Sequence, residues 1–240
     1  MATGHTVKAF DDDLGQVRAL VAEMGGLAEA AIAGAMQALI HRDAEAAARV
    51  VEGDRRIDEI EAEVERLVVR LIALRAPMAD DLREVLAAMK IAGTIERIGD
   101  YAKNIAKRVP LLQDLKPIEP LAIMPAMGSA VAGMVHDVLD AFAARDADAA
   151  LAVSAEDRSV DDFYNSLFRT LLTHMMENPQ NITPSTHLLF IGKHLERIGD
   201  HATNIAEMVY FAVTGRQMTE RPRGIDVLAP SAPAPGAGAE

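Results

Sequence analysis

The sequence contains no cysteine and no tryptophan, and aromatic residues make up only 4% of its 240 positions. Without cysteine there can be no disulfide framework, zinc ribbon or iron–sulfur cluster, so any metal must be held by oxygen or imidazole. Half of the residues are apolar, and we therefore expect aliphatic cores in one or two compact domains. The absence of cysteine also points to a cytoplasmic protein.

Positive charge is also scarce. The chain has 24 Lys and Arg against 36 Asp and Glu, which gives a formal net charge of −12. Such a chain repels a phosphate backbone, so no nucleic-acid partner is expected, whereas cations or basic partners are favoured. Residues 1–13 show no secretory signal. The uncharged stretch 120–135 contains two prolines and is shorter than the ~20 residues of a membrane span, so we expect no transmembrane segment.

The chain is composed of two copies of one unit, offset by about a hundred residues. Residues 90–106 (KIAGTIERIGDYAKNIA) align with residues 190–206 (FIGKHLERIGDHATNIA), and both contain Glu-Arg-Ile-Gly-Asp. The upstream blocks 42–47 and 54–58 likewise match blocks 145–150 and 157–161. We therefore expect two similar halves.

Apolar residues recur every three to four positions in both copies, which is typical of amphipathic helices, and no segment alternates as a strand would. Prolines at several expected ends support this division. We place six long helices near residues 12–41, 44–74, 79–109, 121–144, 147–177 and 184–214.

Short connections make neighbouring helices antiparallel, so the predicted fold class is all-α, with two tandem three-helix bundles. We assign the first bundle to residues 1–112 and the second to residues 118–215. Residues 219–240 are rich in Pro, Ala and Gly, and we expect them to be disordered.

The third helix of the first copy carries two carboxylates away from its apolar stripe. At about 100° per residue, Glu96 and Asp100 lie roughly 140° to 180° from the centre of the apolar stripe that includes Ile91, so they face outward. Two like charges four residues apart repel each other, and something should offset that cost. The second helix supplies a comparable acidic stripe that includes Asp54, Asp58, Glu61 and Glu65. Because the second and third helices are antiparallel neighbours, they can bring their two carboxylate pairs together.

Two converging pairs offer up to eight hard oxygen donors, which suit cations such as Mg, Mn or Fe. The second copy repeats this pattern, although its stripe continues with Tyr164 and Phe168 in place of acids. The candidate metal ligands are Asp54, Asp58, Glu96 and Asp100 in the first copy and Asp157, Asp161, Glu196 and Asp200 in the second.

The alternative for these acids is an ordinary solvated helix face with arginines as ion-pair partners, namely Arg55, Arg97, Arg158 and Arg197. The histidines lack the paired spacing of a metal site, and only His201, beside Asp200, is kept as a further possible ligand. Gly25 and Gly26 lie inside a helical pattern and indicate close packing or a kink, not a phosphate-binding loop. No nucleophile elbow or nucleotide fingerprint is visible, so catalysis is not expected.

The duplicated Glu-Arg-Ile-Gly-Asp helices and their upstream Asp-x-x-x-Asp partners resemble the PhoU family of phosphate-uptake regulators. Residues 5–14 and 75–83 are also similar to that family, and the resemblance covers roughly residues 1–213. It implies a pseudo-twofold pair of three-helix bundles that carry multinuclear metal clusters at surface Glu/Asp-x-x-x-Asp motifs. Those motifs fall on the eight carboxylates named above, and Tyr164 and Phe168 argue against equal occupancy of the two sites.

The resemblance also implies a function. The family represses the phosphate-starvation response when phosphate is plentiful and limits uptake, by coupling the ATPase subunit of the phosphate ABC transporter to a phosphate-sensing histidine kinase. We therefore expect a cytoplasmic, metal-binding adaptor that is not an enzyme, touches the membrane only through its partners and forms a homodimer.

Two other hypotheses are a carboxylate-bridged metalloenzyme or metal store built on a helical bundle, and a structural helical dimer without metal. Enzymes of the first class usually place Glu and Glu-x-x-His ligands inside the bundle. In this sequence the acids are expected to face outward.

Overall fold

The structure, a computed structural model, describes residues 3–218, with side chains from Lys8 onward. The described part is all-α and contains no strand. Its six long helices are α1 (Thr3–His41), α2 (Ala44–Arg75), α3 (Asp80–Ala106), α5 (Met124–Ala144), α6 (Ala147–Glu177) and α7 (Ile182–Thr214). The short elements are α4 (Val109–Leu112) and the 3-10 turns η1 (Glu119–Ile123) and η2 (Pro179–Asn181).

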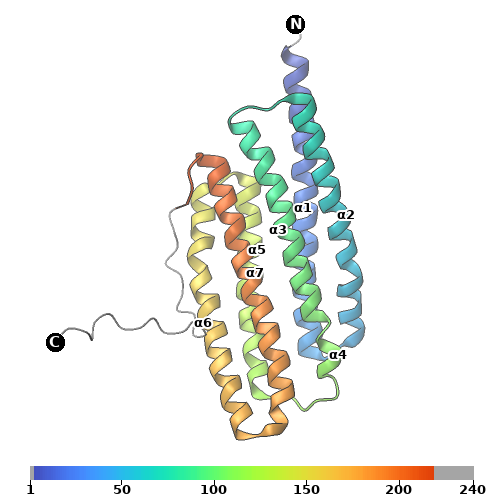
Figure 1. Cartoon of the computed structure of the whole chain (residues 1–240), viewed down its shortest axis with the longest axis vertical. Coiled ribbons are helices and arrows are strands. Elements are labelled where there is room, and N and C mark those ends of the chain that lie inside the picture. Colours follow the sequence, from blue (N-terminus) through green and yellow to red (C-terminus); the bar gives the residue numbers. More distant parts are fainter. Residues whose placement is uncertain (1–2, 219–240) are drawn as a thin grey trace, which may run out of the picture.

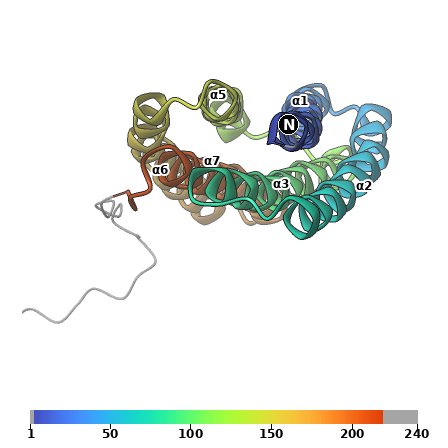
Figure 2. The same ribbon diagram turned by 90° about the horizontal axis from the view of Figure 1, so that it is seen from above.

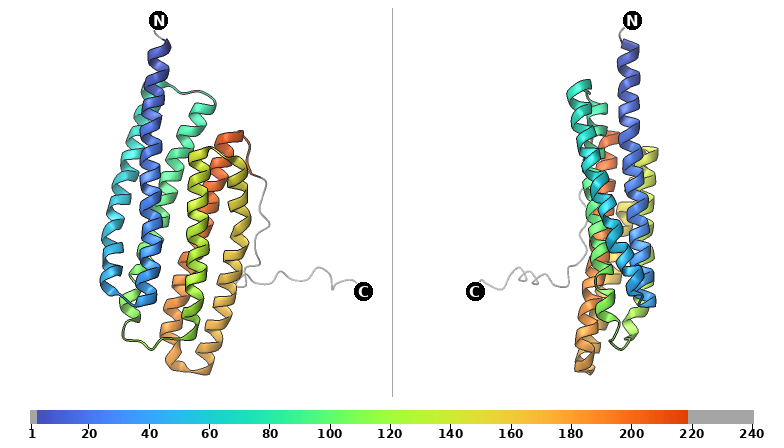
Figure 3. Two further views of the ribbon diagram at one scale, coloured as in Figure 1. Left: turned by 180° about the vertical axis from the view of Figure 1, so that it is seen from behind. Right: turned by 90° about the vertical axis from the view of Figure 1, so that its right-hand side faces the viewer.

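The long helices form two three-helix bundles, as predicted: α1, α2 and α3 in the first and α5, α6 and α7 in the second. The bundles join where α3 packs along α7, and α1 also touches α5 (Figure 1). Seen from above, α2, α3, α7 and α6 form a curved layer with α1 and α5 on its concave side (Figure 2). The view from behind shows α1 and α5 in front of that layer (Figure 3).

Most helix ends agree with the sequence prediction, and all but one of the larger differences lie at prolines. The third helix ends at Ala106, and Pro110 instead opens the short helix α4. The fourth helix begins at Met124, after the turn η1. The last helix begins at Ile182, before Pro184, because a proline in the first turn costs no hydrogen bond. The first helix begins at Thr3, earlier than predicted.

The helices α2 and α6 start with the same turn, which the duplication has copied. Arg42 and Arg145 adopt left-handed backbone conformations with φ of 55° and 54°. The following Asp43 and Asp146 then cap the helices, each Oδ1 accepting the amides two and three residues ahead at 2.9 to 3.0 Å. This side-chain cap satisfies amides that a helix start leaves without partners.

The cores are aliphatic, as expected. The apolar stripes of α3 and α7 are fully buried, at Ile91, Ile95, Ile98, Ile191, Leu195 and Ile198. Gly25 marks the close approach of α1 and α5, because a Cβ there would lie 2.6 Å from a Leu139 methyl group. A Cβ at Gly26 would meet open space. Close packing is therefore confirmed for the first of these glycines.

Two helices contain windows that are long and apolar enough to cross a membrane by length and composition alone, Lys8–His41 and Leu121–Ala144. These are α1 and α5, which face the inner side of the four-helix layer. Val17 and Val21 of α1 and Val131 and Val138 of α5 are fully buried. The apolar stripes of both helices therefore serve as core contacts of the bundles.

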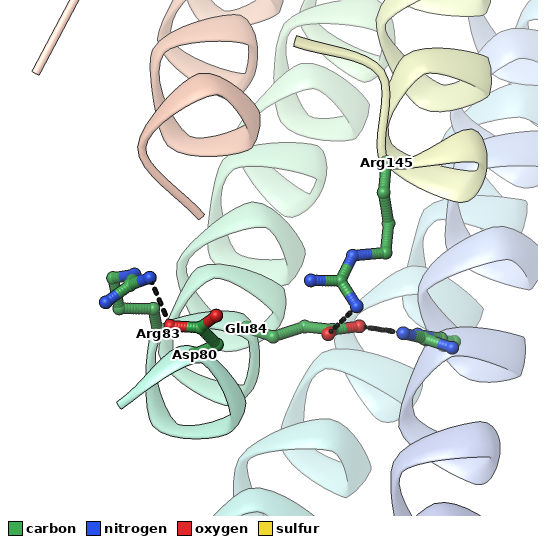
Figure 4. A network of polar contacts seen from close by, with 5 residues as sticks. Asp80, Arg83, Glu84 and Arg145 are labelled. Carbon is green, nitrogen blue, oxygen red and sulfur yellow. Dashed lines mark hydrogen bonds and ion pairs between the residues drawn. The ribbon is translucent and has the colours of Figure 1, made fainter. Parts of the chain in front are cut away.

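A charged network ties the two bundles together at one end. The carboxylate of Glu84 in α3 is 7% exposed, lies 3.0 Å from Nη1 of Arg145 in the second bundle, and also pairs with Arg18 of α1. Arg83 pairs with Asp80 beside it (Figure 4). The expected tail at residues 219–240 lies outside the described residues, and the domain limits at 112 and 118 stay predictions.

Candidate metal centres

The first acidic cluster lies between α2 and α3. Burial raises the pKa of Glu96, and the charges of Asp100, Asp58 and Glu61 raise it further. Burial likewise raises the pKa of Asp58, followed by the charge of Asp54 and, more weakly, that of Asp100. Because their carboxylates act on one another, these residues of two helices share one site, as the sequence predicted. Glu61, which belongs to the acidic stripe of α2, joins them.

Gly99 of the Glu-Arg-Ile-Gly-Asp motif sets the distance between the two helices. A Cβ on Gly99 would lie 2.8 Å from Cδ1 of Ile57 and 3.4 Å from Oδ1 of Asp54. The close approach buries Asp54, which is 5% exposed, and leaves its Oδ1 without a hydrogen-bond partner. Glu96 and Asp100 point away from the bundle core but are partly buried, because α2 covers that side of α3.

Lys103 supplies the counter-charge of the first cluster. Its Nζ pairs with both Asp54 and Asp100, and its side chain is 19% exposed. Burial opposes the charge of this ammonium, but hydrogen bonds to Asp100 and Asp54 outweigh it and raise the pKa of Lys103. Sequence reasoning missed this residue, although its position three residues after Asp100 places it on the same helix face.

The second cluster lies between α6 and α7. Burial raises the pKa of Asp161, as do the charges of Asp157 and Asp200. The pKa of Glu196 is also raised by burial, against the opposing effect of Lys193, whose Nζ lies 2.6 Å from Glu196 Oε1. The other oxygen, Oε2, is buried without a hydrogen-bond partner. All four predicted carboxylates of the second copy are thus brought together.

The two clusters carry their lysines at opposite ends. Where the first has Lys103, the second has Thr203, whose hydroxyl donates to Oδ1 of Asp157 at 3.3 Å. Where the second has Lys193, the first has Gly93. The Lys193 ammonium lies 5.2 Å from the centre of the Tyr164 ring. The first cluster therefore has an additional acid, Glu61, at the end where the second has a lysine over an aromatic ring.

The predicted arginine partners do not pair with these acids. Within residues 8–218, Arg55, Arg97, Arg158 and Arg197 form no ion pair with the eight carboxylates, whereas Lys103 and Lys193 do. The arginine pairing that the alternative assumed is therefore not found in the described residues. His201, the further possible ligand, has its ring stacked on Tyr101 at a centroid distance of 5.5 Å. Its surroundings are aromatic and cationic.

The donor set suits a hard cation in its chemistry. It consists of carboxylate oxygens, and two of them, Oδ1 of Asp54 and Oε2 of Glu196, are buried acceptors without a hydrogen bond. In the described part of the chain, no three carboxylates or imidazoles are arranged to hold a metal ion. Coordination would therefore require side-chain rotation and, in the first cluster, displacement of Lys103.

Known proteins match both halves of the chain. The PhoU domain model matches residues 21–109 and 124–209. The phosphate-specific transport system accessory protein PhoU homolog of Zymomonas mobilis is 61% identical over 226 residues, which cover 94% of this chain and 95% of that protein. The homolog of Caulobacter vibrioides is 48% identical over 227 residues, covering 94% and 99% of the two chains.

Solved structures agree with the sequence matches. The crystal structure of PhoU from Pseudomonas aeruginosa superposes with a TM-score of 0.83 at 40% identity, covering 86% of this chain and all of that one. The phosphate transport system regulatory protein PhoU from Streptococcus pneumoniae gives a TM-score of 0.81 at 30% identity, covering 87% and 99%. Fold, internal duplication and sequence identity lead to the same conclusion: the chain belongs to the PhoU family.

Proposed function

We propose that the chain is a negative regulator of the phosphate-starvation response and a modulator of phosphate uptake. Its relatives in Zymomonas mobilis and Caulobacter vibrioides are named accessory proteins of the phosphate-specific transport system. The structural observation that supports a regulatory binding role is the pair of acidic clusters, one in each bundle, built by equivalent helices. The chain then acts by binding and carries out no catalysis.

The proposed partners are the ATPase subunit of the phosphate ABC transporter and a phosphate-sensing histidine kinase. An adaptor between them works as a homodimer in the cytoplasm and meets the membrane only through these partners. The buried apolar stripes of α1 and α5 are compatible with this location, because they are used in the bundle cores.

The acidic clusters are proposed to bind hard cations such as Mg, Mn or Fe. Asp54, Asp58, Glu96 and Asp100 would hold metal in the first cluster, and Asp157, Asp161, Glu196 and Asp200 in the second. A bound cation would supply positive charge that neutralises the mutual repulsion of carboxylates from two helices. It would replace Lys103 as the partner of Asp54 and Asp100 and so hold α2 against α3.

Deletion of the gene tests the regulatory role. In phosphate-rich medium, cells without the chain are expected to express phosphate-starvation genes, because the repressing adaptor is missing. The measurement is transcript level with and without a plasmid that restores the chain. Unchanged expression in the deletion strain would contradict the proposed function.

Elemental analysis tests the metal sites separately. Protein purified without chelator is expected to contain metal that is lost in an Asp100→Asn/Asp200→Asn variant. Glu52→Gln/Glu156→Gln is the matched control, since it removes two exposed carboxylates from α2 and α6 outside the clusters. Equal metal content in all three proteins would show that the assigned residues do not bind the metal. Redox turnover of bound iron would favour the metalloenzyme alternative.

A further inference from the structure

Between the two acidic clusters, the contact line of α3 and α7 carries a different chemistry. The two helices run in opposite directions on the face seen in Figure 1. The antiparallel pairing brings Tyr101 to His194 and His201, and Arg108 to His187 and Phe190. We call this strip the α3–α7 seam. It consists of Arg97, Tyr101, Arg108, His187, Phe190, His194, Arg197 and His201.

The seam is positively charged within a protein whose net charge is −12. Among the described residues, Arg97, Arg108 and Arg197 form no ion pair with a carboxylate. Their charge acts on neighbouring imidazole rings. Burial lowers the pKa of His194 to about 4, and the charges of Arg108 and Arg197 lower it further. Burial also lowers the pKa of His201, followed by the charges of Arg97 and Arg197. Three guanidinium groups therefore act on one strip, and in the described chain no carboxylate forms an ion pair with any of them.

Aromatic rings lie beside two of these three cations. The guanidinium of Arg108 lies 4.2 Å from the centre of the Phe190 ring, and that of Arg197 lies 5.7 Å from the Tyr101 ring. Tyr101 itself packs between His194 and His201, at centroid distances of 5.6 and 5.5 Å. Such stacking orders long side chains before a partner arrives, which lowers the entropy cost of binding.

The carboxylates nearest to the seam in sequence are turned to its flanks. Glu96 and Asp100 interact with Asp58 of α2, and Glu196 interacts with Asp161 of α6. The outer faces of α3 and α7 between the clusters are thus left to arginine and aromatic residues. Arg97, Arg197 and Phe190 are exposed there.

The exposed side chains of the seam favour a protein partner over a small molecule. Two hollows of the described surface lie elsewhere, one beside α4 and the other between α5 and α6, and neither includes a seam residue. Exposed arginine and aromatic side chains are the residue types enriched in the energetic centres of protein–protein interfaces.

We propose that the α3–α7 seam is a docking surface for an acidic segment of a partner protein, whose Asp and Glu side chains pair with Arg97, Arg108 and Arg197. The inference deepens the proposed adaptor function and rests on it for the existence of a partner. The proposal is based on charge complementarity. The rest of this acidic chain repels an acidic segment, so binding must be confined to the seam and must weaken as salt is added.

The test measures the affinity of the full chain for the purified phosphate transporter complex and for the purified full-length histidine kinase, each in nanodiscs, at low and high salt. Arg97→Ala/Arg197→Ala is expected to weaken binding to at least one partner tenfold or more and to flatten its salt dependence. Both side chains are exposed, so helix content should not change. Arg66→Ala/Arg70→Ala, which removes two exposed arginines of α2, should stay within twofold of the unchanged chain.

Every other outcome contradicts the docking proposal, and each does so in a way that can be told apart from the rest. If the unchanged chain binds and the seam variant binds equally well, the seam proposal fails while the adaptor function stands. If the unchanged chain binds neither partner, the adaptor function fails and the seam proposal with it. Conversion of a dimer to a monomer by the seam substitutions would make a second copy the occupant. If the unchanged chain binds inorganic phosphate and the seam variant does not, the occupant of the seam would be a small anion.

Discussion

At the scale of single residues, Lys103 distinguishes the two acidic clusters. Its ammonium group bridges Asp54 and Asp100, whereas the equivalent Thr203 only donates a hydrogen bond to Asp157. A lysine in that place competes with any cation for the same oxygens. The sequence showed the acids but not this competitor, because pairing across two helices depends on rotamers that a helical wheel does not contain.

Replacing the competitor tests this reading. Lys103→Thr, tested in an Asp200→Asn background so that the first cluster dominates, is expected to raise Mn²⁺ affinity about tenfold, since Asp54 and Asp100 lose their internal counter-ion. Calorimetric titration measures this affinity. Without metal the same change should destabilise the fold by roughly 1 to 3 kcal/mol, because a buried carboxylate is left without its partner. Unchanged or weaker affinity would contradict the competition.

Glu96 gives a pH-dependent prediction. Burial and the charges of Asp100, Asp58 and Glu61 raise its pKa in the folded chain, so the folded state binds that proton more tightly than the unfolded state. The resulting stabilisation is present below the ordinary glutamate pKa and is lost as pH rises through the raised value. In chelator at pH 7, Glu96→Gln should therefore raise the free energy of unfolding by a few tenths of a kcal/mol.

At a pH below the ordinary glutamate pKa the same substitution should change stability little, because the native side chain is then neutral as well. Urea unfolding at the two pH values makes the comparison. A gain in the free energy of unfolding that is larger in acid than at neutral pH would contradict this prediction.

At the scale of helices, the duplicated turns before α2 and α6 give matched sites. Asp43→Ala and Asp146→Ala each remove a side-chain cap that accepts two amides. Each is expected to cost about 1 kcal/mol of stability. Chemical unfolding of both single variants and of the double variant measures the loss. A negligible effect in both would show that water caps these helices equally well.

Periodicity predicted the type and number of the long helices because each buries one apolar stripe. Their ends were harder to predict, since a proline can either stop a helix or open one. Pro110 opens α4, and Pro184 lies inside the first turn of α7. For the site, the repeat and the four-residue spacing identified the candidate carboxylates, while the burial of Asp54 depends on how closely Gly99 lets α2 approach α3.

At the scale of the whole molecule, the packing of α3 on α7 was not predicted. Amphipathic patterns specify each bundle, but the α3–α7 seam contains arginine, histidine and tyrosine, which a sequence pattern assigns to solvent. The Glu84 network adds a second connection, because Glu84 in α3 pairs with Arg145 of the other bundle and with Arg18.

Removing the cations of that network tests its contribution. Arg18→Met/Arg145→Met leaves the buried Glu84 carboxylate without a counter-charge, and about 3 kcal/mol of stability should be lost. Adding Glu84→Met should restore most of it, since no buried charge then remains. Thermal unfolding of the double and triple variants gives the comparison. A triple variant less stable than the double one would contradict this account.

The central claim is that the paired acidic clusters are required for regulation. Its most direct test is a phosphate-starvation reporter in phosphate-rich medium, in a deletion strain that expresses either the Asp100→Asn/Asp200→Asn chain or the Glu52→Gln/Glu156→Gln control at equal protein levels. The cluster variant is expected to leave the reporter on, whereas the control is expected to switch it off. Full repression by the cluster variant would contradict it.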